Sequence, residues 1–321
     1  MNKLIVIAAI VFLSGVAACS GGNSESQLVP EPAVRLEGTI GLSTRGVIDS
    51  GYEGELKVSF ARQDGTAASA ESYGAWRICK AVREGGAGSR LIVFDEPQWY
   101  PPDGRTIHLH GYYPAVDGTL DPQTGKATFT VDGKTDIMAT GCLSAGTYEP
   151  VRTCTFRHLL TQIAWVCYGD RAELWGAVTK IAVVEVHTRQ ELDYGLESPS
   201  LADVSSGDGI QDLLVQDIAG LPVPPVAEGE GLPDPQGYIL LPVSPVDGTA
   251  EHPLLLRITT TKDGRGNNLE TVTPVSVMVE GGFQPGRRHV VSLFFSGNGA
   301  VQISSVRVEA WTEHDAGEWP I

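Results

Sequence analysis

The stretch Ala33–Gly46, AVRLEGTIGLSTRG, combines a two-residue hydrophobic period with a polar, basic exit. Successive side chains of an extended chain point to opposite sides, so residues two apart share a face. The apolar or small residues of the stretch fall on one such face: Val34, Leu36, Gly38, Ile40 and Leu42. The stretch therefore predicts a β-strand that buries one face in a sheet.

The exit of this strand, Ser43-Thr44-Arg45-Gly46, is polar and contains a single basic residue. Exposed segments of small and polar residues are preferred sites of proteolytic cleavage. A cut between Arg45 and Gly46 would release the strand and open a hydrophobic groove where four aliphatic side chains had been: Val34, Leu36, Ile40 and Leu42. In the alternative interpretation the strand is permanent and Arg45 lies in a surface turn.

The first 18 residues carry one basic residue, Lys3, followed by an apolar run from Leu4 to Val16. A run of this length is typical of a secretory signal and is too short to span a bilayer. The sequence Val16-Ala17-Ala18-Cys19 matches the lipobox of bacterial lipoprotein precursors, which predicts Cys19 as the lipidated residue. An ordinary signal peptide cleaved nearby is the alternative. Residues 19–32 are polar and contain glycine and proline, so we interpret them as a flexible tether.

About 290 residues follow, which is comfortable for two domains. Short β-branched and aromatic runs alternate with Gly, Pro and Asp-Gly turns, the pattern of an all-β chain. We expect an N-terminal β-sandwich domain at 33–152 and a C-terminal one at 153–321, with the boundary in Cys142–Thr153. The only helix candidate is Leu201–Ile218. The predicted strands are 56–62, 75–82, 90–94, 106–113, 126–131, 136–141, 154–168, 177–187, 237–241, 254–260, 271–279, 288–295 and 306–311.

The formal net charge is −16, and the segment Gln190–Gln236 holds ten acidic residues and no lysine or arginine. A field of this sign repels phosphate backbones, so nucleic acid is not an expected partner. The segment reads as a solvated, mobile surface loop. A calcium site on Asp203, Asp208 and Asp212 is the alternative, because calcium prefers clustered carboxylates.

Several motifs resemble the fimbrillin family. Ile107–Thr140 has the Tyr-Tyr-Pro strand end and the Asp-hydrophobic-Met-Ala strand of the family, and Phe156–Leu160 resembles its Phe-x-His strand. Phe283–Leu293 and the end of the chain, with Trp311 and Gly317, are similar to the closing strands. With the lipobox and Thr44-Arg45, the resemblance covers nearly the whole chain after the signal.

Fimbrillins are lipoprotein precursors of type V pili, so the resemblance implies two tandem transthyretin-like β-sandwich domains. It also implies that an Arg- or Lys-specific protease removes the first strand and that a neighbouring subunit's C-terminal strand fills the groove. Cys19 would then carry the lipid, and Arg45-Gly46 would be the maturation site. Val306, Val308 and Ala310 alternate on one face near the end of the chain, which makes them the candidate donor strand.

Sites for catalysis are not apparent. His108 and His110 share a strand face and could offer two imidazoles to a metal, but no third ligand is near in the sequence. The Gly-Lys pairs fail the phosphate-loop spacing, and neither Gly-x-Ser-x-Gly nor His-Glu-x-x-His occurs. His158 reads as a hydrogen-bonded core residue. We therefore expect no enzyme activity, no cofactor and no metal.

Four cysteines besides Cys19 would fold outside the reducing cytosol. Cys142 and Cys154 flank the proposed boundary and are the first choice for a disulfide bond. Cys154 with Cys167 is the alternative, and four free thiols, Cys79 included, is the third possibility.

The sequence thus predicts a structural subunit of an adhesive pilus that is assembled by donor-strand exchange. Its partners would be other pilus subunits, and a lipid anchor would hold it to the outer membrane at the cell surface. The alternative is a surface lipoprotein that does not polymerise and binds glycans or host ligands. An exposed platform of Trp99 and Tyr100 would favour that alternative, because aromatic rings stack on sugars.

Overall fold

The computed structural model describes residues 33–41, 51–66, 73–115, 120–193, 198–226 and 231–310. All of them belong to one compact unit, Glu31–Ile321. The described chain consists of strands and two single-turn 3-10 helices, η1 (Ala172–Leu174) and η2 (Gly207–Gly209), so the all-β prediction is confirmed. Within these ranges no helix is long and apolar enough to cross a bilayer. Residues 1–32, Leu42, Arg45 and Gly46 lie outside the described residues.

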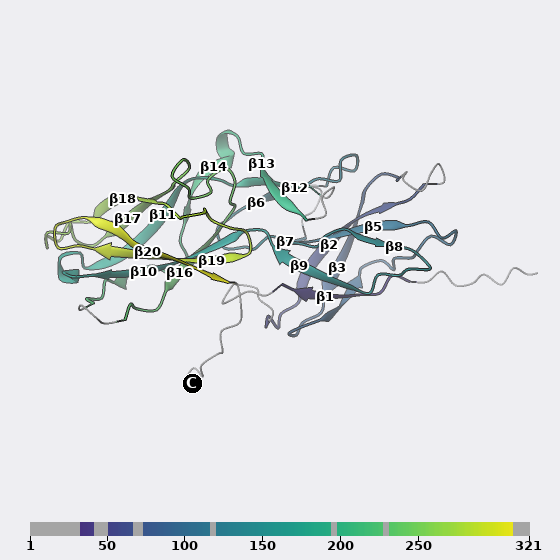
Figure 1. The fold of residues 1–321 in the computed structure, drawn as a ribbon, viewed down its shortest axis with the longest axis horizontal. Helices are drawn as coiled ribbons and strands as arrows, with labels where there is room; N and C mark the ends of the chain where they lie inside the picture. The colour runs from purple at the N-terminus through teal and green to yellow at the C-terminus, as the bar shows by residue number, and fades with distance from the viewer. Residues whose placement is uncertain are drawn as a thin grey trace, which may run out of the picture. The chain divides into compact units, whose positions relative to one another are not determined.

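Seven strands of the first sheet close on themselves in the order β2-β3-β4-β1-β9-β7-β5, because β5 also pairs with β2. All of these strands except β4 are labelled in Figure 1. We call this arrangement the ring. The pairing of β1 with β9 is parallel, and the other pairings described within the ring are antiparallel. The ring strands are β1 (Leu36–Ile40), β2 (Leu56–Asp64), β3 (Arg77–Arg83), β4 (Arg90–Phe94), β5 (Ile107–Tyr113), β7 (Met138–Ala139) and β9 (Thr153–His158), and β8 (Leu143–Ala145) pairs with β5.

Alternation of apolar and polar residues gives the ring its core. The inward residues of successive strands, such as Leu36, Val58 and Phe156, are fully buried and belong to one cluster. The rings of Phe60 and Phe156 meet edge to face with their centres 6.1 Å apart. An aromatic pair in this geometry contributes beyond the area it buries, so it fixes the centre of the ring core.

Two further sheets share a second core, to which Trp165, Ile181, Ile258 and Leu293 belong. In the first of these sheets β10 and β19 run parallel, and β20 is an edge strand antiparallel to β19. The first sheet has the order β16 (Gln236–Leu241), β10 (Thr161–Gly169), β19 (Arg287–Phe295), β20 (Val301–Ala310). The second has the order β14 (Ile210–Leu214), β11 (Ala177–His187), β17 (Leu254–Thr260), β18 (Thr271–Val277), and β15 (Leu221–Pro222) also pairs with β11.

The predicted strand 154–168 is two strands. The chain breaks at Leu159 and Leu160, where the Leu159 N–H donates to the carbonyl oxygen of Ile137 at 2.9 Å. β9 lies in the ring, whereas β10 lies in the sheet with β19, so the two halves of the run serve different sheets. The first strand after the expected boundary at Thr153 therefore pairs within the ring, and division into separately folding domains stays a prediction.

The acidic segment contains strands rather than the expected helix or an unstructured loop. β12 (Arg189–Asp193) pairs with β13 (Ser200–Asp203) and with β6 (Ala127–Thr130). The helix expected at Leu201–Ile218 is wrong, because β13, η2 and β14 occupy that range. Scattered leucines, among them Leu192 and Leu213, are buried and hold the segment to the core.

The buried His289 predicts a pH dependence of stability. Burial lowers its pKa to about 4 from 6.5, with a smaller effect of Arg287. Between these values the unfolded chain binds a proton that the folded chain does not, so the free energy of unfolding falls as pH falls from about 6.5 to about 4. We expect His289→Gln to reduce that slope by about 1.4 kcal/mol per pH unit, as measured by denaturant unfolding at several pH values.

The same substitution at the exposed His252 is the control. A slope that His289→Gln leaves unchanged would contradict this account.

Candidate functional site

The first strand, β1, closes the ring between β4 and β9. Leu36 lies opposite Ile92 of β4, and Ile40 lies opposite Phe156 of β9. The Gly41 N–H extends the parallel ladder by donating to the carbonyl oxygen of Phe156 at 2.7 Å. Taking β1 away would leave the facing edges of β4 and β9 without a strand partner.

The predicted hydrophobic face of β1 is buried as expected. Leu36 is 0 % exposed, Ile40 5 % and Val34 6 %, while Arg35 and Glu37 are on the exposed face. These three aliphatic side chains belong to the ring core. Leu42, the fourth residue of the predicted face, lies outside the described residues.

Gly38 sits where the ring core leaves no room for a side chain. A Cβ atom built at Gly38 would lie 2.8 Å from Cδ1 of Ile92 and 3.4 Å from Cε2 of Phe156. The glycine therefore lets β1 approach β4 and β9 closely enough for the ladder to form on both sides.

A buried arginine holds the middle of β1. Arg83 is 0 % exposed and donates from Nε to the carbonyl oxygen of Gly38 at 3.1 Å. Its Nη2 atom donates to the carbonyl oxygens of Gly86 and Gly88 at 3.0 and 2.6 Å. Burial lowers the pKa of this guanidinium, so carbonyl oxygens are what stabilise its charge. One of those carbonyls belongs to β1.

A histidine holds the end of β1. His158 and Asp136 are both buried, and Nδ1 of His158 is in hydrogen-bond contact with Oδ2 of Asp136. The Nε2 atom of His158 lies 3.3 Å from the carbonyl oxygen of Gly41, the last described residue before Leu42. The expectation of a hydrogen-bonded core histidine is confirmed, and its contact lies between β1 and the segment that leads to Arg45.

The candidate donor residues lie on β20, which is less buried than β1. Val306 is half-buried and Val308 is 47 % exposed. Ala310 ends the strand opposite Arg287 of β19. In this structure β20 is thus an edge strand of its own sheet, and no residue of it whose side chain is described is fully buried.

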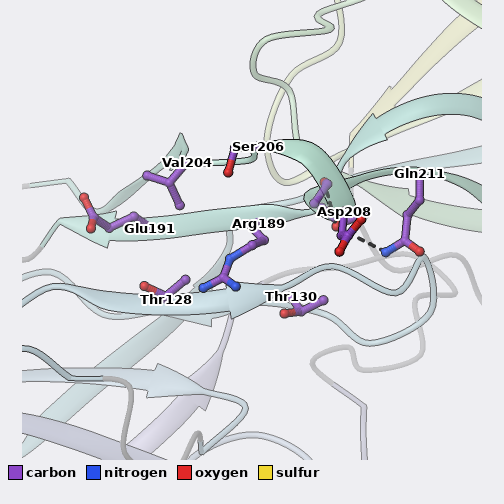
Figure 2. Close-up of a pocket in the computed structure, with 10 residues that line it drawn as sticks. Thr128, Thr130, Arg189, Glu191, Val204, Ser206, Asp208 and Gln211 are labelled. Carbon is purple, nitrogen blue, oxygen red and sulfur yellow. Dashed lines mark hydrogen bonds between the residues drawn. The ribbon is translucent and has the colours of Figure 1, made fainter.

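A polar hollow of about 720 Å³ lies over β6 and β12 (Figure 2). The side chain of Arg189 extends toward β6 between Thr128 and Thr130. At the other end, Gln211 donates to Oγ1 of Thr188 at 3.3 Å. Among the described residues that line the hollow none is aromatic, so they offer hydrogen bonds but no surface on which a sugar face could stack. Nothing in the sequence of the acidic segment pointed to it.

The candidate metal ligands are not assembled into a site. His108 stacks on Tyr73 and His110 lies against Trp76, with ring centres 4.2 and 5.4 Å apart. Burial lowers the pKa of His110 to about 4, with a smaller effect of His108. Across the described ranges no three His, Cys, Asp or Glu side chains are grouped so that they could hold a metal ion.

The three carboxylates of the alternative calcium site have separate surroundings. Asp203 accepts from Ser205 and lies 2.7 Å from Nδ1 of His187, and Asp212 pairs with Arg257. Asp208 lines the polar hollow instead.

The four described cysteines are free thiols: Cys79, Cys142, Cys154 and Cys167. The disulfide bond favoured between Cys142 and Cys154 is therefore absent, and so is the alternative between Cys154 and Cys167. Burial raises the pKa of both Cys154 and Cys167 to about 12, so these thiols are neutral at physiological pH.

Of the two residues expected to form an aromatic platform, Trp99 is exposed and Tyr100 is buried. Trp99 is 44 % exposed, but Tyr100 is 1 % exposed and donates from its hydroxyl to the carbonyl oxygen of Val151 at 3.4 Å. Tyr100 therefore anchors its loop and cannot stack on a ligand.

No family model and no curated protein matches this sequence. The structure is similar to that of a candidate cell adhesion protein from Bacteroides uniformis, with a TM-score of 0.59 and 16 % identity over 87 % of this chain and 98 % of the other. A second candidate cell adhesion protein, from Bacteroides ovatus, has a TM-score of 0.55 and 14 % identity, over 89 % of this chain and 99 % of the other. A fimbrial protein from Bacteroides vulgatus has a TM-score of 0.54 and 13 % identity, over 88 % of this chain and 100 % of the other.

The chain has the fold of these proteins. The resemblance to fimbrillins that the sequence motifs indicate is therefore matched at the level of the fold.

The close approach at Gly38 predicts the effect of a larger side chain. Gly38→Val would push Ile92 and Phe156 out of their positions, so we expect it to lower the free energy of unfolding by about 1–3 kcal/mol. Denaturant unfolding of the purified protein measures the change. Glu37→Val, on the exposed face of the same strand, is the matched control and should change stability by less than about 0.5 kcal/mol; equal effects of both would mean that the core around Gly38 is loose.

Proposed function

We propose that the chain is a surface lipoprotein and a structural subunit of an adhesive pilus, assembled by donor-strand exchange after its first strand is removed. The observation that carries the proposal is the position of β1. This strand completes a closed ring whose buried face is mostly apolar but includes the buried Arg83. Arg45 comes five residues after Ile40, the last residue of β1. The solved structures with the same fold include a fimbrial protein and two candidate cell adhesion proteins. The role is structural rather than enzymatic.

The burial of β1 sets the energy that assembly could use. Val34, Leu36 and Ile40 each contribute about 1.5–3 kcal/mol when fully buried, which gives on the order of 5–9 kcal/mol for the three as an upper estimate. A whole domain is stable by only about 5–15 kcal/mol. A subunit that has lost β1 would therefore hold an open apolar groove and bind a replacement strand.

The groove would also offer hydrogen bonds to an incoming strand. The edges of β4 and β9 that now pair with β1 would be open, and a strand of another subunit can pair with both. Backbone pairing gives affinity, and the alternate side chains that enter the groove give specificity.

The end of the chain suits the role of donor. The side chains on one face of β20 have the same order of sizes as those of β1, two large and then one small. They are Val306, Val308 and Ala310 on β20 and Val34, Leu36 and Gly38 in the first strand. Ala310 would then take the place of Gly38, where its Cβ atom would lie 2.8 Å from Cδ1 of Ile92, so the end of the Ile92 side chain would have to shift. Since β20 has no fully buried side chain among those described, leaving β19 costs less than removing β1.

The remaining parts of the proposal concern the segment before the fold. Cys19 would be the lipidated residue that anchors the protein to the outer membrane, and residues 20–32 would be the tether. Stable anchoring by lipid needs more than one acyl chain, as bacterial lipoproteins carry. The domain division at 152 and 153 belongs to the same proposal.

Cleavage at Arg45 should start assembly. We expect the protein cut there by an Arg-specific protease to form ladders that resist dissociation in detergent, because the open groove captures strands of other copies. N-terminal sequencing identifies the cleavage site, and gel electrophoresis detects the ladders. The control is the Arg45→Ala variant, treated with the same protease. Ladders in both samples, or complete cleavage at Arg45 without ladders, would exclude the mechanism and favour a glycan-binding lipoprotein that does not polymerise.

Lipidation is tested separately. Cys19→Ala should move the protein from the membrane fraction to the soluble fraction and abolish labelling by a clickable fatty acid, since the acceptor thiol is lost. Cys142→Ala, which removes an exposed thiol elsewhere, is the control and should keep the label. Labelling that persists in Cys19→Ala would show that the lipid is attached at another residue or that the label is not specific.

A further inference from the structure

A cleft of about 500 Å³ opens at one end of the ring, between the ends of β2 and β3 and the loop that follows β4. We call it the Trp99 cleft. Arg62, Asp64 and Arg77 line one side, and Gln98, Trp99 and Arg105 line the other. These six side chains do not belong to the ring core, although Cys79 and Tyr100, which also line the cleft, do.

Hydrogen bonds from the buried Arg62 fix the loop that carries Trp99. Arg62, only 3 % exposed, donates from Nη2 to the carbonyl oxygen of Trp99 at 2.7 Å and from Nη1 to Oε1 of Gln98 at 3.1 Å. Tyr100 is buried directly after Trp99. Prolines on both sides of this pair, Pro97 and Pro101, restrict the backbone further. A site that is built before its ligand arrives loses less entropy on binding.

Arginines are concentrated in the Trp99 cleft of a chain whose net charge is −16. Three arginines and two carboxylates line it, and Arg105 also pairs with Asp103 at 2.6 Å. Arg62 and Arg77 share the carboxylate of Asp64 at 2.6 and 3.0 Å, which holds the guanidinium of Arg77 at the wall. Arg77 and Arg105 have 54 % and 41 % of their side chains exposed. Two guanidinium groups are therefore accessible to an anionic ligand, and planar guanidinium groups match carboxylates in geometry.

The exposed ring of Trp99 adds a flat apolar surface beside these charges. Large aromatic rings are usually buried, so a tryptophan 44 % exposed on a rigid loop next to two arginines is unusual. An extended peptide would bind through an open strand edge. β2 has strand partners on both edges, whereas β4 pairs with β3 only at Ala81–Arg83, so the Arg77–Cys79 part of β3 that lines the cleft is paired with β2 alone. Exposed side chains, among them Trp99, also line this part of the cleft.

We propose that the Trp99 cleft binds an acidic saccharide, a sugar ring that carries a carboxylate. The apolar face of the ring stacks on Trp99, and the carboxylate accepts hydrogen bonds from Arg77 and Arg105. This assignment goes beyond the proposed pilus subunit and holds whether or not the protein polymerises. It names a site and a ligand chemistry through which a surface protein of this fold could attach.

The test is calorimetric titration of the purified full-length protein with two acidic probes, a galacturonate trisaccharide and a sialylated trisaccharide, and with their uncharged counterparts. We expect at least one acidic probe to bind, the uncharged counterparts to bind at least about tenfold more weakly, and added salt to weaken the binding. The pair of acidic probes distinguishes a uronic acid from a sialic acid as the source of the carboxylate. Failure of both acidic probes to bind overturns the proposal.

Variants assign the binding to the cleft. Trp99→Ala and Arg77→Gln should each weaken binding about tenfold or more, while Trp99→Tyr should retain most of it. Arg171→Gln is the matched control, because Arg171 is an exposed arginine paired with Glu173 far along the chain. Unchanged binding in Trp99→Ala overturns the site, and equal binding of a hexaglutamate peptide overturns the saccharide in favour of an acidic peptide. Unchanged unfolding midpoints in these variants show that losses come from the cleft.

Discussion

The ring of Phe156 stands at the centre of the closed sheet, and two glycines make room for it. A Cβ atom at Gly38 would lie 3.4 Å from its Cε2, and one at Gly111 would lie 3.0 Å from its Cζ. Strands that carry side chains in place of Gly38 and Gly111 could not approach the aromatic ring of Phe156 closely enough to close the sheet. Closure removes sheet edges that would otherwise pair with other chains. Closure of the seven-strand sheet therefore depends on the side chain of Phe156, which packs between Gly38 of β1 and Gly111 of β5.

The sequence predicts best where one face of a strand is buried. The ranges of β4, β11 and β17 are recovered residue for residue, because their apolar residues are β-branched or alternate and turns bound them. The buried face of β1 follows from the same alternation. These features are local, so no knowledge of the rest of the chain is required.

The failures have physical reasons of their own. The run from Cys154 to Tyr168 contains no Gly, Pro, Asn or Asp that would signal a turn, so the sequence does not show that the chain leaves one sheet and enters another at Leu159. The strands of the acidic segment are short and polar, since β12 and β13 bury few side chains, and only pairing with β6 reveals them. Arg83 and Arg62 were missed because buried arginines satisfied by carbonyl oxygens leave no pattern in the sequence. The Trp99 cleft likewise depends on residues distant in the chain that only the fold assembles.

Backbone contacts at the start of the chain link the groove that β1 fills to the Trp99 cleft. The Val34 N–H donates to the carbonyl oxygen of Gln98 at 2.8 Å, and Ala33 bridges to Trp99, so the start of the first strand supports the cleft loop. Two equilibria that share a contact are coupled, and the coupling is reciprocal. A ligand that binds better to the supported loop would strengthen the hold on a strand that makes the same contact as Val34, and insertion of such a strand would tighten the cleft by the same factor. Attachment and cohesion would then reinforce each other, so that a fibre under load is held together most firmly in the subunits that have found a ligand.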